Sequence, residues 1–137
     1  MKLIGIMTNN VECVSPDTPV TQLAGKMKTL DVGFIPVCEN DRLVGTVTDR
    51  DIVLRAVAEN RDISACNARD IMSRDIFYCF EDEDVKDAAK KMREKEVRRM
   101  LILDRQKRLA GVVSIGDISK VDEKVSGQTL HEITEAA

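Results

Sequence analysis

The sequence has few of the residue patterns that carry out catalysis. His131 is the only histidine, and no nucleophile is paired with it. No Gly-x-x-x-x-Gly-Lys loop of the phosphate-binding type is present, and no cysteine has a base nearby in sequence. The many carboxylates fall on predicted helix faces and turns, where exposure to solvent explains them. We therefore expect a protein that is not an enzyme.

Long apolar stretches are also missing. No run approaches the eighteen or so residues that span a bilayer, and the first residues lack the apolar region of a signal peptide. The 137 residues are 43% hydrophobic and 33% charged, as in ordinary soluble proteins. A net charge of −3 argues against nucleic acid as the main partner. These features predict a cytoplasmic protein without membrane contacts.

The four cysteines (Cys13, Cys38, Cys66 and Cys79) lack the Cys-x-x-Cys spacing of many zinc sites. Cys13, Cys38 and Cys79 lie in apolar runs typical of strands, where a reduced cysteine acts as a small hydrophobic residue. The sequence favours buried thiols and no metal. A metal site assembled only in the folded chain is the alternative.

The chain contains the same unit twice. Ile6-Met7-Thr8 recurs as Ile71-Met72-Ser73, an offset of 65 residues (6 to 71). One extra residue in the turn near Gln106 increases the offset to 66 (45 to 111), so three further residues correspond: Gly45 to Gly111, Thr48 to Ser114, and Asp51 to Asp117. We expect one unit plus a linker over residues 1–66, and a second unit plus a C-terminal tail over 67–137.

Each copy has the pattern strand–helix–strand–strand–helix. In the first copy we expect strands over 11–14, 33–38 and 42–47, and helices from 20 to about 30 and from 49 to about 58. In the second we expect strands over 76–80, 99–103 and 109–113, and helices over 84–95 and 115–121, preceded by a short helix near 67–72. The tail contains an amphipathic piece with Leu130 and Ile133. One copy has too few strands to bury both faces of its sheet, so we predict an α/β (α+β) fold with two units packed sheet to sheet in pseudo-twofold symmetry.

The main candidate site is the junction from Gly45 to Asp51, repeated from Gly111 to Asp117. A glycine is followed by a hydroxyl residue three positions later and an aspartate six positions later. Free N–H groups and the helix dipole attract phosphate, and a carboxylate can accept both hydroxyls of a ribose. Alternatively, Thr48 and Ser114 cap helices and the aspartates balance the first turn. The repetition of the pattern favours a bound nucleotide.

The order of the repeats and three motifs resemble a tandem pair of cystathionine-β-synthase-type (CBS) domains, the Bateman module, over roughly residues 5–122. The motifs are the Ile-Met openings, the strands Val-Gly-Phe-Ile-Pro-Val and Val-Arg-Arg-Met-Leu-Ile, and the Gly-x-x-Ser/Thr-x-x-Asp junctions. Thr-Asp-Arg-Asp-Ile and Ile-Gly-Asp-Ile further resemble small stand-alone bacterial members. The resemblance implies a shared cleft for up to two ligands, commonly AMP, ADP, ATP or S-adenosylmethionine.

The resemblance also implies which residues line the two sites. Asp51 and Asp117 would bind ribose hydroxyls, with Thr48 and Ser114 facing phosphate or the ribose edge. The Ser114 site would be completed by Thr8, the Glu12 backbone, Val32, Gly33 and Phe34. The Thr48 site would be completed by Ser73, Phe77, Val97, Arg98 and Arg99.

Arg98 and Arg99 are the predicted phosphate contacts, because a guanidinium fork matches phosphate oxygens. Neighbouring strand residues point to opposite faces, so only one should enter a given site. The alternative is that both lie on a solvated strand edge.

From these features we expect a non-catalytic regulatory module that binds an adenosine-containing ligand. It would need no cofactor and would act through an unknown regulated protein or its own dimer. The predicted helix from Asp51 to Val57 is apolar on more than one side, which favours a homodimer. The alternative function is a dimerisation or protein-interaction module without a ligand, in which Phe34 fills part of the cleft.

Overall fold

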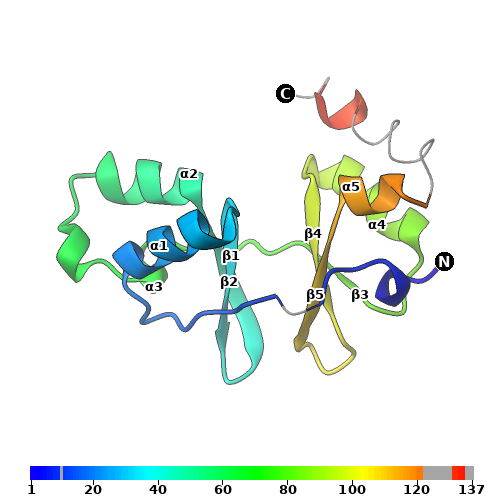
Figure 1. Ribbon diagram of the computed structural model, residues 1–137, viewed down its shortest axis with the longest axis horizontal. Helices are drawn as coiled ribbons and strands as arrows, with labels where there is room; N and C mark the ends of the chain where they lie inside the picture. The colour runs from blue at the N-terminus through cyan, green and yellow to red at the C-terminus, as the bar shows by residue number, and fades with distance from the viewer. Residues whose placement is uncertain (10, 122–130, 135–137) are drawn as a thin grey trace. The chain divides into compact units, whose positions relative to one another are not determined.

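The computed structural model describes residues 1–9, 11–121 and 131–134 (Figure 1). Its chain forms two compact units. Residues 12–76 make up the first, which we call the contiguous unit. The second, the two-segment unit, combines residues 1–11 with the chain from Phe77 onward. Both units mix helices with a sheet, which confirms the predicted fold class.

The contiguous unit is built on an antiparallel hairpin of β1 (Phe34–Glu39) and β2 (Arg42–Thr48). Asn40 and Asp41 form its turn with φ values of 53° and 64°, a left-handed backbone that Asn and Asp tolerate. Ahead of this hairpin in the chain, Val14 forms a single parallel bridge with Val37 of β1. The strand predicted over 11–14 is therefore too long, because only Val14 of this range pairs with a strand.

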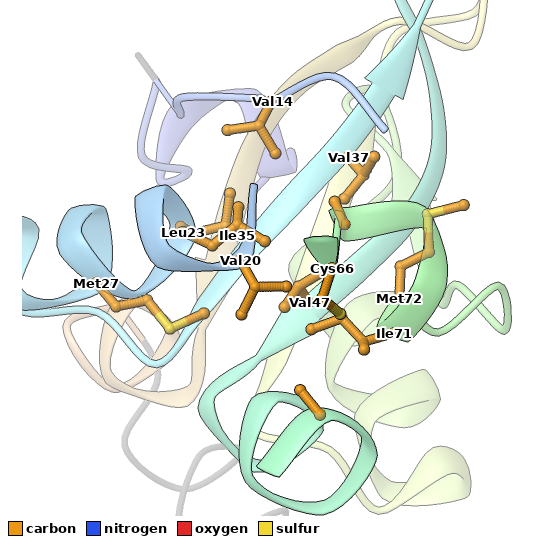
Figure 2. Packing of buried hydrophobic residues seen from close by; sticks show 12 residues of the cluster. Val14, Val20, Leu23, Met27, Ile35, Val37, Val47, Cys66, Ile71 and Met72 are labelled. Atoms are coloured by element: carbon orange, nitrogen blue, oxygen red, sulfur yellow. The ribbon is translucent and has the colours of Figure 1, made fainter. Parts of the chain in front are cut away.

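Helices cover this hairpin with their apolar sides. In α1 (Val20–Leu30) the buried residues follow helical spacing, and in α3 (Ala68–Ile71) the two end residues are buried. After β2 the chain forms α2 (Asp49–Asp51) and continues as the π-helix η2 (Ile52–Val57), where a single α-helix was predicted. The 3₁₀ turn η3 (Ile63–Ala65) lies in the predicted linker. Figure 2 shows the resulting core, formed by Val14, Val20, Leu23, Met27, Ile35, Val37, Val47, Ala56, Cys66, Ala68, Ile71 and Met72.

The two-segment unit has a three-stranded sheet in the order β3-β4-β5, formed by β3 (Tyr78–Phe80), β4 (Arg99–Leu103) and β5 (Leu109–Ser114). β3 is parallel to β4, and α4 (Val85–Lys95) connects them. β4 pairs antiparallel with β5, which leads into α5 (Ile115–Ser119). The buried residues of α4 are Val85, Ala88, Ala89 and Met92, which follow helical spacing.

Each compact unit contains the opening segment of the other repeat: residues 1–11 fold with the second repeat, and the chain up to Ile76 folds with the first. Leu3, in the 3₁₀ turn η1 (Leu3–Gly5), is fully buried in the core of the second repeat's unit. Thr8 exchanges two backbone hydrogen bonds with Val112, of 2.8 and 3.1 Å. Ser73 does the same with Thr46 in the contiguous unit, at 3.0 and 2.8 Å. The compact units therefore do not end where the repeats end.

The cysteines are only partly as predicted. Cys66 and Cys79 are free and buried, which confirms the prediction for this pair. Cys13 and Cys38 instead form a disulfide, so the prediction of buried thiols is wrong for them. The apolar pattern around each cysteine gave no sign of the pairing, because the partners are 25 residues apart.

Part of the predicted tail falls outside the described residues, including Leu130. Residues 131–134 are helical, and Ile133 is buried. Among the residues that the structure describes, no helix has the length and apolar character needed to cross a membrane.

Candidate ligand-binding junctions

The two predicted junctions have the same local structure. At the end of β2, the Thr48 hydroxyl accepts a hydrogen bond from the Asp51 N–H (3.0 Å), and Asp51 Oδ2 accepts one from the Thr48 N–H (2.9 Å). At the end of β5, the corresponding distances between Ser114 and Asp117 are 3.1 and 2.9 Å. Both are reciprocal capping boxes. The capping alternative is therefore present in both copies.

Capping leaves part of each carboxylate for other partners. It occupies Oδ2 in both aspartates, whose side chains are half-buried. Asp51 Oδ1 lies 3.7 Å from Arg55 Nε. Asp117 Oδ1 accepts no hydrogen bond from the described part of the chain. Because a carboxylate offers about four acceptor positions, capping does not prevent Asp117 from binding a hydroxyl.

The junction glycines are required by the close approach of another segment. A Cβ on Gly111 would lie 2.6 Å from the Thr8 carbonyl oxygen, and a Cβ on Gly45 would lie 2.8 Å from that of Ser73. Both distances are too short for any side chain. Each glycine thus admits the opening segment of the other repeat, which brings Thr8 near the Ser114 junction and Ser73 near the Thr48 junction.

Phe34 and Gly33 lie beside the Thr48 junction of their own unit. Phe34 pairs with Thr48 across the hairpin, and the Asp49 N–H donates to the Gly33 carbonyl at 3.0 Å. Val32, just before them, is exposed. We predicted that these three residues share a site with Ser114. Because Ser114 belongs to the other unit, this shared site stays a prediction.

Arg98 and Arg99 occupy the equivalent position at the Ser114 junction. Arg99 pairs with Ser114 across the sheet, and the Ile115 N–H donates to the Arg98 carbonyl at 3.1 Å. Both arginines are exposed, whereas Val97 is half-buried against the core. The Ser114 junction therefore has two basic residues where the Thr48 junction has Gly33 and Phe34. The site predicted to combine Val97, Arg98 and Arg99 with Thr48 of the other unit also stays a prediction.

A family model for the CBS domain matches residues 3–58 and 68–124 of the chain. The chain belongs to the CBS domain family. The predicted resemblance is thus confirmed, and the two CBS matches cover most of the sequence.

Relatives in the CBS family include proteins of similar length. The CBS domain-containing protein YhcV of Bacillus subtilis is 35% identical over 130 residues, covering 93% of this chain and 91% of YhcV. A crystal structure of Hypoxic Response Protein I with two coordinated zinc ions has a TM-score of 0.80 and 31% identity, covering 89% of this chain and 99% of the other. A crystal structure of CBSX2 in complex with AMP has a TM-score of 0.76 and 25% identity, covering 87% and 93%. In the described residues of our chain, no group of three or more His, Cys, Asp and Glu residues could hold a metal ion.

Arg55 is a residue of the first CBS repeat that sequence reasoning missed. Its guanidinium Nη1 donates to the carbonyl oxygens of Ile71 and Met72, at 3.3 and 3.2 Å. It thereby connects Asp51 to the end of α3, two residues before Ser73. The second repeat has Val121 at the matching position. Only the spacing of Asp51 and Arg55, four residues apart, could have indicated the ion pair. The contact makes the two junctions unequal, because Asp51 forms an ion pair with Arg55, whereas Asp117 forms none with the described residues.

Proposed function

We propose that the protein is a non-catalytic regulatory module that binds an adenosine-containing ligand at its two junctions. The candidate ligands are AMP, ADP, ATP and S-adenosylmethionine. The proposal rests mainly on the Ser114 junction, where Asp117 Oδ1 accepts no hydrogen bond from the described residues and β5 pairs with β4, which begins at Arg99 directly after Arg98. The AMP complex of CBSX2 supports the same ligand class. The ligand signal would pass to a separate regulated protein or to a second copy of the chain.

This proposal assigns Arg98 and Arg99 to the Ser114 junction of their own unit, in place of the grouping with Thr48 that the family resemblance implies. The residues of this junction have separate roles. The Asp117 carboxylate accepts hydrogen bonds from the ribose hydroxyls while it caps α5. Either Arg99, the first residue of β4, or Arg98 just before it binds the phosphate through its guanidinium fork. The backbone of the Thr8 segment forms part of the wall beside Gly111.

The test is calorimetric titration of AMP and adenosine into the wild type and two variants. Asp117→Ala should weaken both ligands about tenfold to a hundredfold, because hydrogen bonds to a charged acceptor contribute roughly 1.5–3 kcal/mol. Arg99→Ala, or Arg98→Ala if that side chain faces the ligand, should weaken AMP and leave adenosine almost unchanged.

Asp87→Ala is the matched control for lost capping. Asp87 holds the same capping-box position in α4, away from the junction. Both aspartate variants lose the hydrogen bond that the N-cap N–H donates to the N3 carboxylate, which should cost about 1 kcal/mol of stability, but only Asp117→Ala should lose affinity. Equal affinities in the two variants would leave Asp117 with a capping role alone. If the wild type binds no ribose-bearing compound at millimolar concentration, the nucleotide proposal fails.

A second candidate function is a dimerisation module without a ligand. It is favoured by the exposed side of η2, where Val53, Leu54 and Val57 are 55%, 44% and 59% exposed. Such a cluster of apolar side chains is typical of an interaction surface. We expect a homodimer formed through this side, with twice the chain mass by light scattering at micromolar concentration. Leu54→Glu should then yield monomers, whereas a monomeric wild type would contradict the dimer.

A further inference from the structure

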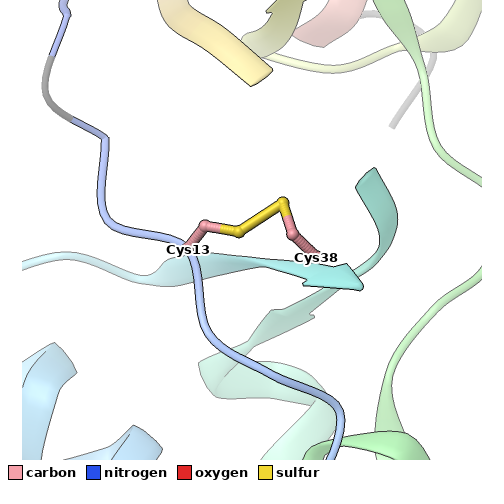
Figure 3. The surroundings of a disulfide bond; sticks show 2 residues. All are labelled: Cys13 and Cys38. Atoms are coloured by element: carbon pink, nitrogen blue, oxygen red, sulfur yellow. A yellow bond between two sulfur atoms is a disulfide. The ribbon is translucent and has the colours of Figure 1, made fainter. Parts of the chain in front are cut away.

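The disulfide of the contiguous unit is accessible from solvent. Figure 3 shows Cys13 on the segment that leads into the unit and Cys38 on β1. Their Cα atoms are 5.9 Å apart, within the usual range for a disulfide. Cys13 is exposed and Cys38 is half-buried. By contrast, Cys66 and Cys79 are only 3% and 1% exposed.

The backbone brings the two cysteines together without help from the bond between them. The Val14 N–H donates to the Pro36 carbonyl at 3.1 Å, and the Cys38 N–H donates to the Val14 carbonyl at 2.9 Å. Val14 is itself buried in the core, and Glu12 pairs with Lys26 of α1 at 2.9 Å. These contacts join residues 12–14 to β1 and α1, and none of them involves a sulfur atom. We therefore expect the fold to persist when the bond is reduced.

We propose that Cys13 and Cys38 form a redox-active pair that interconverts between dithiol and disulfide by exchange with small thiols and disulfides. In oxidation, the exposed Cys13 thiolate attacks a small disulfide, forming a mixed disulfide and releasing one small thiolate. The Cys38 thiolate then attacks Cys13 Sγ, closes the Cys13–Cys38 bond and releases the second small thiolate. Two protein thiols lose two electrons and two protons, and one small disulfide becomes two small thiols. Reduction runs the same steps backwards.

The other two cysteines do not take part in this exchange. Burial raises the pKa of the Cys79 thiol to about 11, and burial also raises the pKa of the Cys66 thiol. The thiolate is the reacting species in exchange, and a small disulfide must also reach the sulfur. Cys66 and Cys79 therefore remain thiols under conditions that oxidise the exposed pair, which makes them internal controls.

Oxidation should stabilise the contiguous unit. The bond closes a loop with a sequence separation of 25 residues that contains all of α1. Closing such a loop restricts the unfolded chain more than the folded one. We expect the melting temperature of the oxidised protein to exceed that of the reduced protein by about 10 °C. The pair would respond to a change from a reducing to an oxidising environment, independently of any nucleotide.

The experiment uses the full chain, incubated under native conditions with glutathione disulfide or with dithiothreitol. Alkylation after denaturation, followed by intact mass and peptide mapping, should find two free thiols in the oxidised form, Cys66 and Cys79, and four in the reduced form. The Cys13→Ser and Cys38→Ser variants should each have the same melting temperature after either incubation, once any mixed disulfide with glutathione has been removed. The Cys66→Ala variant should keep the wild-type difference in melting temperature between the oxidised and reduced forms.

Several results would overturn the proposal. The pair could stay reduced in excess glutathione disulfide, or glutathione could remain attached to Cys13 without a Cys13–Cys38 bond. Equal melting temperatures for the two forms of the wild type would equally contradict it. None of these measurements depends on an adenosine ligand, so the redox proposal and the binding proposal fail separately.

Discussion

Leu3→Ala is expected to destabilise the two-segment unit by about 3 kcal/mol, although the residue lies almost at the start of the chain. Leu3 is fully buried and belongs to the same core cluster as Met92 and Met100. Truncation removes favourable burial and leaves a cavity, which together cost roughly 2–5 kcal/mol for a core leucine. Hydrogen exchange should show the lost protection in α4 and β3–β5, elements of the second repeat.

The neighbouring residue provides the control for this change. Ile4 is 55% exposed, so Ile4→Ala should alter stability by no more than about 0.5 kcal/mol. Chemical denaturation of both variants measures the difference. If Leu3→Ala weakened α1, β1 and β2 instead, the opening segment would belong to its own repeat, and the exchange of segments would be wrong.

Gly45→Ala is the second change with a large expected effect. The new Cβ would lie 2.8 Å from the Ser73 carbonyl oxygen and 3.0 Å from Met72 Sδ. Ser73 cannot move away freely, because it exchanges two backbone hydrogen bonds with Thr46. Either the clash remains or the bonds lengthen, and overpacking of this kind typically costs about 1–3 kcal/mol. We expect a loss near 3 kcal/mol in chemical denaturation.

Gly25→Ala makes the same chemical change in α1 of the same unit, with the opposite expected sign. No heavy atom lies within 4 Å of a Cβ built there. Alanine is favoured over glycine in a helix by about 1 kcal/mol, so this variant should be more stable than the wild type. Equal effects of the two substitutions would show that the backbone approach at Gly45 is not tight.

Local patterns in the sequence were sufficient to predict most of the secondary structure. Apolar runs on both sides of Asn40 and Asp41 predicted the two strands of the hairpin, and the sequence predicted a helix over 84–95, where α4 lies. Periodicity shows which side of an element is apolar, but it cannot show which unit covers that side. For this reason the burial of Leu3 with the second repeat was not predicted, and neither was the pairing of Cys13 with Cys38.

Only part of the candidate site could be predicted, because local patterns do not show contacts between residues far apart in the chain. Spacing located Thr48 and Asp51 with their counterparts Ser114 and Asp117, because a junction motif is local. The same spacing is required by a capping box, so the sequence could not separate capping from binding. The contacts of Arg55 join residues far apart in the chain, and no local pattern predicts them.

The exchanged opening segments have a consequence for how the protein could have arisen. One copy of the repeat, folded alone, would lack the segment that fills the space beside its junction glycine. Two separate copies could supply these segments to each other as a swapped dimer, a common route to symmetric assembly. Fusion of two such genes would place the exchange within one chain without changing its contacts. After fusion neither copy can be lost, because each holds an essential part of the other's core.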